Sequence, residues 1–181
     1  MNTMADTTIQ KNVKAASTAE NSVQLILINI GSSFYAIDIM KIVEIVKYMP
    51  VTPVPRAPDF LEGVIDLRGD IIPVIDMRKR FEIPGDGAQE KLRIVIIKVI
   101  DKVAGLIVDG VKEVLRVPAK KVLPPPRIVQ GIESEYLSSV VSDRGRIILV
   151  LNLDRILTTT ERVQFKNLVF KNKKQETGGK E

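Results

Sequence analysis

Carboxylates are the side chains that could carry out proton transfer in this chain, because its 181 residues include no His and no Cys. Asp66, Asp70 and Asp76 lie close together in the sequence and could act as an acid–base pair or hold a hard cation. Arg68 and Arg78 lie among them, however, and the spacing matches no calcium-binding loop. Asp is also common at turns for local reasons. A carboxylate hydrolase is therefore a disfavoured alternative, and the sequence predicts no catalytic residue.

The two missing residue types exclude further chemistry. Without Cys there is no thiolate nucleophile and no disulfide framework, and without His there is no Ser-His-Asp triad. The usual zinc ligand sets are missing as well. The glycines do not form the G-x-G-x-x-G pattern of a nucleotide-binding loop. We therefore expect an intracellular protein that is not an enzyme and has neither a metal nor a cofactor.

Targeting signals are not evident at the N-terminus. Residues 1–22 lack the apolar core of a signal peptide, and no apolar run approaches the ~18 residues of a membrane span. We expect a soluble, cytoplasmic protein that does not insert directly into a membrane.

The formal charge of +5 raises the alternative of a small barrel that binds nucleic acid. Part of this charge lies in residues 171–181, which contain four Lys and two Glu. Such a barrel needs basic side chains interleaved with exposed aromatic ones. The five Phe and three Tyr are scattered, and Phe34 and Tyr35 lie in an apolar strand. Nucleic-acid binding stays an alternative, but we expect none.

The composition favours an all-β fold, because 23 Ile and 22 Val make up about a quarter of the chain. Short apolar runs separated by turn residues are typical of a small all-β domain. A three-residue loop at 31–33, a turn at 101–102 and a Pro-rich connector at 49–59 separate strands, and 60–63 suggests one helical turn. The predicted strands are 23–30, 34–39, 42–48, 64–67, 71–76, 92–100, 103–108, 111–117, 140–142 and 147–153.

The order of elements repeats along the chain. Residues 66–77 match 142–153 at five of twelve positions, and 42–46 resemble 111–115. This repeat predicts two copies of a five-strand, barrel-like unit that hides its edges. We place the first barrel at about 34–90 and the second at about 92–153, and the strand 23–30 could pair with either.

The ends of the chain have a different character. Residues 1–22 and the basic segment 171–181 are predicted to be disordered tails. Thr160 is predicted to cap a helix at about 160–170, with Val163, Leu168 and Val169 on its apolar side.

The strand at 42–48 has a mixed surface that suits protein recognition. Alternation would place Val43 and Ile45 on the core face, and Ile42, Glu44 and Val46 on the other. Apolar groups beside a charge suit a protein–protein site, and Arg68 at a turn tip can make forked hydrogen bonds to a partner. The alternative is that the other copy simply covers this face.

Six motifs stand in a recognisable order: Phe34–Ile39, Ile42–Ile45, Pro58–Gly69, Ile72–Arg78, Val103–Val111 and Glu135–Leu137. Together they resemble the CheW-like domain family of bacterial chemotaxis coupling proteins. The resemblance covers about residues 23–165, and we take 23–170 as the domain. It implies two five-stranded SH3-like barrels packed around a shared hydrophobic junction, with short helices including one near the C-terminus.

The resemblance also implies a function without chemistry. Members of the family are adaptors that join the cytoplasmic tips of chemoreceptors to the histidine kinase CheA, whose regulatory domain shares the fold. The expected location is therefore the inner face of the membrane, reached through receptor arrays.

Binding residues are implied by the same resemblance. Receptor contact in the groove between the barrels would fall to Ile42, Glu44, Gly63 and Arg68. The kinase would contact Leu123 and Ile128, in the Pro-rich loop of the second barrel. Many relatives have Asn where this chain has Asp66, whose charge could weaken or pre-orient Arg68.

Overall fold

The computed structural model describes residues 21–85, 88, 90–126 and 135–168. Eleven strands dominate it, with short 3-10 turns η1 (Ile39–Lys41), η2 (Ala119–Lys121) and η4 (Leu153–Arg155). The helices are α2 (Met77–Arg80) and α3 (Thr159–Asn167). The strands are β1 (Ser22–Ile30), β2 (Ser33–Asp38), β3 (Ile42–Lys47), β4 (Gly63–Leu67), β5 (Asp70–Asp76), β6 (Arg93–Val99), β7 (Lys102–Val108), β8 (Gly110–Pro118), β9 (Val122–Leu123), β10 (Leu137–Asp143) and β11 (Arg146–Leu151).

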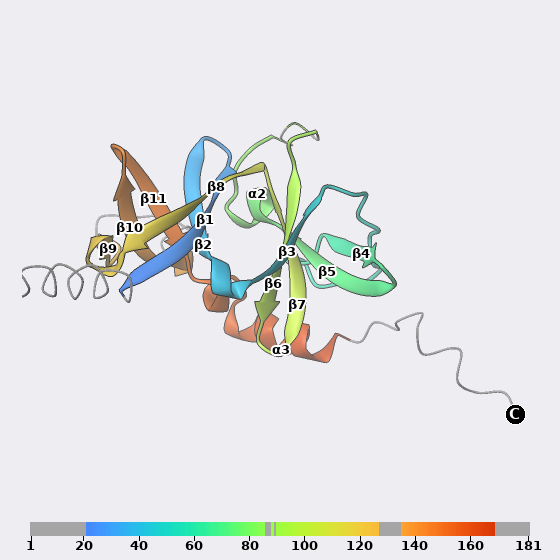
Figure 1. Cartoon of the computed structure of the whole chain (residues 1–181). Coiled ribbons are helices and arrows are strands. Elements are labelled where there is room, and N and C mark those ends of the chain that lie inside the picture. The colour runs from blue at the N-terminus through green and yellow to red at the C-terminus, as the bar shows by residue number, and fades with distance from the viewer. Residues whose placement is uncertain (1–20, 86–87, 89, 127–134, 169–181) are drawn as a thin grey trace, which may run out of the picture.

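Two sheets stand side by side, with α3 beneath them in the view of Figure 1. One has six strands in the order β8-β1-β2-β11-β10-β9, and the other has five in the order β3-β6-β7-β5-β4. Most neighbours are antiparallel, but β11 runs parallel to β2, and β5 runs parallel to β7. The expected mostly β fold with two units and short helices is confirmed.

The two sheets correspond strand by strand, but they exchange strands. The pair β1-β2 takes the same place in the six-stranded sheet that β6-β7 takes in the five-stranded one. Each sequence copy therefore sends its first two strands into the other copy's sheet. The strands at 93–108 therefore pair with strands of the first copy, across the division expected between 90 and 92. The strand at 23–30 pairs with β8 of the second copy.

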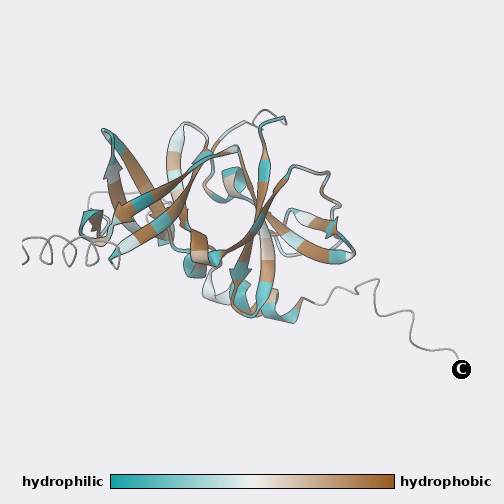
Figure 2. Ribbon diagram, viewed as in Figure 1, coloured by the Kyte–Doolittle hydropathy of each residue, from teal (hydrophilic) through white to brown (hydrophobic). Residues whose placement is uncertain are grey.

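Three apolar clusters fill the structure. Leu25, Leu27, Leu115 and others form the core of the six-stranded sheet's unit, and Ile65, Val74, Ile94 and others form that of the second unit. The largest cluster lies between the sheets and contains Ile28, Tyr35, Val95, Leu106 and Phe165. Figure 2 shows the hydrophobic residues concentrated along the strands. The expected hydrophobic junction is thus this central cluster.

Two tight turns lie at slightly different residues from those expected from the sequence. The β1–β2 loop has two residues, Gly31 and Ser32, because Ile30 pairs with Ser33. The β6–β7 turn lies at Ile100 and Asp101, one residue earlier than expected, and Ile100 adopts φ +58°. Residues 60–63 form no helical turn: Leu61 N–H bonds to Pro58 O at 3.0 Å, and β4 begins at Gly63.

The C-terminal helix begins earlier than Thr160. Thr158 is its N-cap, and it exchanges hydrogen bonds with Glu161 in a capping box. Phe165 is the fully buried side chain of this helix, whereas Val163 is 57% exposed. The expected apolar position Val169 lies outside the described residues. None of the described helices is long and apolar enough to cross a membrane.

Candidate interaction site

Glu44 and Arg68 meet at the surface of the five-stranded sheet. Glu44 lies on β3, and Arg68 lies in the turn that joins β4 to β5. Their side chains form an ion pair, in which Arg68 stays 70% exposed and Glu44 30% exposed. Because β3 and β4 are the outermost strands of this sheet, the pair joins its two edges. A second guanidinium edge is left for a partner.

The turn that carries Arg68 has an unusual backbone. Arg68 and Gly69 adopt φ values of +55° and +89°, as a two-residue hairpin turn with two left-handed positions requires. The Asp66 carboxylate accepts a hydrogen bond of 2.8 Å from Gly69 N–H. Asp66 therefore stabilises the turn beneath Arg68, and Glu44 is the acid that pairs with the guanidinium.

Gly63 lies at the start of β4, where the Pro-rich connector packs closely against the strand. It is buried, and a Cβ there would lie 2.3 Å from the carbonyl oxygen of Thr52. Thr52 and Val64 exchange two backbone hydrogen bonds of 2.8 and 2.9 Å beside it. The residue thus allows the Pro-rich connector to cross β4 closely, and its lack of a side chain serves packing.

The exposed and buried faces of β3 differ from simple alternation. Val43 was expected in the core, yet it is 53% exposed. The reason is a register shift in the β3–β6 pairing, where Ile42 pairs with Ile97 but Glu44 pairs with the adjacent Ile96. Val43 is the extra residue of this bulge. Ile42 is partly buried and packs against the central cluster.

Two further exposed apolar residues were missed by the sequence reasoning. Met40 in η1 is 84% exposed, and Val114 on β8 is 57% exposed. Val114 pairs with Ile26, which packs in the cluster between the sheets, so Val114 lies on the junction side of its sheet. The signal was available in the match of 111–115 to 42–46.

The unit of the six-stranded sheet contains an equivalent of the Glu44–Arg68 pair. Glu113 on β8 corresponds to Glu44 in the repeat, and Arg144 corresponds to Arg68. Arg146 Nη2 lies 3.0 Å from Glu113 Oε1, and Arg144 Nη1 lies 4.0 Å from Glu113 Oε2. In both units, a Glu on an edge strand therefore contacts an Arg of a hairpin.

Arg78 and Asp109 form a buried ion pair where the two sheets meet. Arg78 Nε donates to Asp109 Oδ1 at 2.7 Å, and Gly31 N–H donates to Asp109 Oδ2 at 2.5 Å. Arg78 follows β5 of one sheet, and Gly31 lies between β1 and β2 of the other. This carboxylate thus ties the sheets together, a role that the sequence motifs containing both residues did not reveal.

Leu123 and Ile128, the expected kinase contacts, are less completely described. Leu123 lies on the short edge strand β9 and is 58% exposed, so it is available to a partner. Ile128 lies outside the described residues.

The three carboxylates considered for catalysis are not brought together. Asp66 and Asp70 lie at the hairpin tip, whereas Asp76 lies six residues along β5, about 20 Å away. Asp76 caps α2 by accepting hydrogen bonds from Arg78 and Lys79 N–H. Burial raises the pKa of Asp76 despite those hydrogen bonds. Among the described residues, no group of acidic side chains could hold a metal ion.

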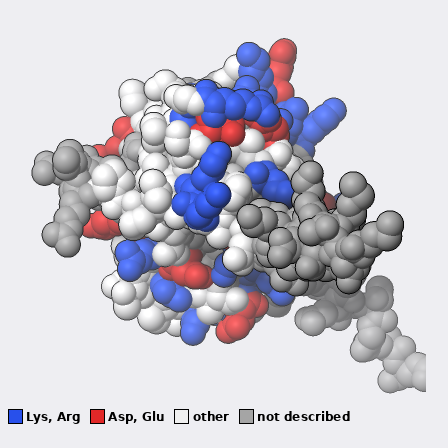
Figure 3. Space-filling model, turned by 60° about the vertical axis from the view of Figure 1, so that its left-hand side comes forward, with Lys and Arg blue, Asp and Glu red and all other residues white. Residues whose placement is uncertain are grey.

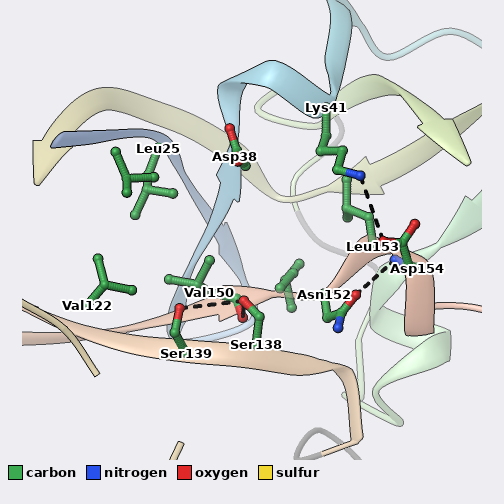
Figure 4. A pocket seen from close by; sticks show the side chains of 12 residues that line it. Leu25, Asp38, Lys41, Val122, Ser138, Ser139, Val150, Asn152, Leu153 and Asp154 are labelled. Atoms are coloured by element: carbon green, nitrogen blue, oxygen red, sulfur yellow. Dashed lines mark hydrogen bonds and ion pairs between the residues drawn. The ribbon is translucent and has the colours of Figure 1, made fainter. Parts of the chain in front are cut away.

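A cavity of about 280 Å³ opens between β1, β10, η1 and η4 (Figure 4). At its rim, Lys41 Nζ lies 3.7 Å from Asp154 Oδ2, so this acid is paired. Ser138 donates its hydroxyl to Val150 O at 3.2 Å. The lining contains no base positioned to activate a serine, and none of the expected site residues lies in it.

Arg80 and Glu161 anchor α3 to the rest of the structure. They form two hydrogen bonds of 2.9 and 2.6 Å, and Arg80 lies 5.3 Å from the centre of the Tyr136 ring. Burial alone would raise the pKa of Glu161, but hydrogen bonds from Arg80 and Thr158 outweigh it, so the pKa is lowered. This pair stabilises the fold at neutral pH.

Charge on the side that carries β9–β11 is mixed. Figure 3 shows Lys and Arg in separate clusters, several with acidic groups beside them and uncharged surface between. No continuous basic track of the kind that follows a phosphate backbone is visible on this face.

The sequence of this chain matches a known protein family. The family model for the CheW-like domain matches residues 24–161. The chemotaxis protein CheW of Treponema pallidum is 36% identical over 149 residues, which span 80% of this chain and 88% of that protein. The chemotaxis protein CheW of Klebsiella aerogenes is 32% identical over 138 residues, or 76% and 83% of the two chains.

A solved structure has a similar fold. It is the crystal structure of the scaffolding protein TtCheW from Thermoanaerobacter tengcongensis, which matches with a TM-score of 0.70 and 32% identity. The match covers 77% of this chain and 94% of the other.

Proposed function

The chain belongs to the CheW-like domain family of non-catalytic chemotaxis scaffold proteins, and from this premise we propose that it couples chemoreceptor tips to the histidine kinase CheA. Signal transfer then takes place through contacts. The protein would work in the cytoplasm, where receptor arrays hold it near the inner face of the membrane.

The Glu44–Arg68 pair is the observation that carries the receptor side of this proposal. An exposed guanidinium at a turn tip, paired with Glu44 whose neighbour Val43 is exposed on β3, combines charge with apolar surface as recognition sites do. Ile42 and Gly63 act beneath this surface, Ile42 by packing and Gly63 by admitting Thr52. We assign Val114 to the groove between the two units, on the wall formed by β8.

Leu123 is the described residue that supports a kinase contact. It is an exposed apolar side chain on an edge strand, and an apolar anchor of this kind suits a protein interface. We propose that the kinase binds on this side of the six-stranded sheet, away from Arg68.

Charge reversal tests whether Arg68 contacts the receptor or only stabilises the sheet edge. Arg68→Glu should weaken binding to a receptor cytoplasmic fragment by about 10-fold or more, as expected for an interface Arg. An exposed ion pair contributes only ~0.2–1 kcal/mol to stability, so the fold should persist. The double variant Glu44→Arg/Arg68→Glu restores an ion pair with reversed polarity.

The double variant gives a clear result either way. If Arg68 contacts the receptor, binding stays weak in the double variant although the pair is rebuilt. Full recovery of binding would mean that the pair is structural and that the receptor site lies elsewhere. Lys166→Glu is the matched control, because Lys166 is exposed on α3 and belongs to none of the proposed contacts.

A further inference from the structure

Strand β8 carries exposed side chains on the junction side of the six-stranded sheet. Val114 and Arg116 are exposed and alternate with the buried Leu115 and Val117. Lys112 is exposed as well, but it is the extra residue of a bulge, because Leu27 pairs with Glu113 and Ile28 pairs with Val111. Arg116 pairs with Gln24 and Val114 pairs with Ile26, which is buried in the cluster between the sheets. Residues opposite one another in a sheet point to the same face. Arg116 therefore lies on the groove side of β8, beside Val114.

A groove of about 420 Å³ runs along this face. It is lined by Arg116 on one side and by Met40 of η1 on the other, with Gln24 of β1 between them. Met40 is 84% exposed, so an apolar side chain is available beside the guanidinium. Asp38 is the acid of the lining, and its carboxylate already accepts a 2.9 Å hydrogen bond from Met40 N–H.

Lys112 and Arg116 on β8 differ from the arginines described above in their ion pairing. Arg68, Arg78 and Arg146 each form an ion pair. Within the described part of the chain, Lys112 and Arg116 form no such ion pair. Arg116 follows Val114 by two residues on the same strand and therefore lies on the same face. Its charge is thus available to a partner beside an apolar side chain.

We infer that the partner segment bound in this groove is acidic, with a carboxylate that pairs with Arg116 beside an apolar side chain that packs on Val114 and Met40. The inference rests on the proposed function, because it names the chemistry of the receptor segment that fits this particular chain. Complementary charge at the edge of an interface sets specificity and the rate of association.

A protein segment fits this surface better than a nucleic acid does. Met40 and Val114 would remain exposed against a phosphate backbone, which offers no apolar group to cover them. The described residues that line the groove include no aromatic ring on which a base could stack.

Charge reversal on β8 tests the inference with the full chain and a receptor cytoplasmic fragment. Arg116→Glu should weaken binding about 10-fold at low salt, and this difference should shrink as salt rises. Lys166→Glu, which makes the same change of charge on α3, should bind like the unaltered chain. A receptor fragment in which a groove-facing Glu is replaced by Lys should bind Arg116→Glu better than it binds the unaltered chain.

The outcomes separate this inference from the proposed function. If the unaltered chain does not bind the receptor fragment, the proposed function fails. If it binds and Arg116→Glu binds equally well at low salt, the groove recognises no acid and this inference is overturned. Arg116-dependent binding of a 20-nucleotide single strand, without binding of the receptor fragment, would overturn both in favour of nucleic acid.

Discussion

Replacing Arg78 by Met should destabilise the whole protein, because it leaves the Asp109 carboxylate buried without its guanidinium. Asp109 is only 9% exposed and Arg78 18% exposed, and the carboxylate also accepts a hydrogen bond from Gly31 N–H at 2.5 Å. The substitution also removes donors to Pro84 O and Gly85 O. Met approximates the length of the Arg stem, so the change is mainly one of charge and hydrogen bonding.

The expected loss is about 3 kcal/mol of unfolding free energy, at the lower end of the cost of removing one member of a buried ion pair. The exposed neighbour Lys79 supplies a matched control. It pairs with Glu62 at 2.6 Å but is 68% exposed. Lys79→Met should therefore cost less than about 1 kcal/mol.

Urea denaturation followed by circular dichroism measures both values. For a domain of this size, 3 kcal/mol corresponds to a fall in Tm of about 6–12 °C. The double variant Arg78→Met/Asp109→Leu should recover part of the loss, since no charge is then left buried. An equal and small effect of Arg78→Met and Lys79→Met would refute the assignment of Arg78–Asp109 as the tie between the sheets.

Two further predictions concern stability. Gly63→Ala should cost about 3 kcal/mol, because its Cβ would overlap the Thr52 carbonyl at 2.3 Å. Gly145→Ala should cost less, about 1 kcal/mol, since no atom lies within 4 Å of its Cβ and only the left-handed φ of +75° opposes a side chain; equal urea midpoints would contradict this. Because the pKa of Glu161 is lowered in the folded state, the unfolded chain binds a proton at this carboxylate more readily than the folded chain does. Its stabilising contribution is therefore present above about pH 4.5 and is lost as pH falls further, and Glu161→Gln should flatten this part of a Tm-versus-pH curve. A curve of unchanged slope would show that the Glu161–Arg80 pair contributes little.

The local elements could be predicted from the sequence because they depend on neighbouring residues. Alternation and turn residues located most strands, and the match of 66–77 to 142–153 identified two equivalent hairpins. Which sheet each hairpin joins depends on long-range pairing such as β1 with β8 and β3 with β6. Both units have the same apolar pattern, so alternation cannot distinguish the exchanged arrangement from two separate barrels.

Part of the site could be predicted because some of its residues belong to local sequence motifs. Glu44 and Arg68 came from a motif, and the structure joins them in an ion pair. Val43 was assigned to the wrong face because a single bulge residue reverses the alternation. The contact of Arg78 with Asp109, 31 residues away, had no pattern to reveal it. The cap at Thr158 was readable, since Glu161 follows it at the spacing of a capping box.

The most direct test of the proposed coupling is the activity of CheA with receptor fragments, measured with and without this chain. We predict that receptor-dependent kinase activity requires this chain and that the control variant Lys166→Glu supports it fully. Arg68→Glu should abolish most of it while its urea denaturation curve stays close to that of the unaltered chain. Kinase activity that does not change when the chain is added would contradict the proposed coupling of receptor and kinase.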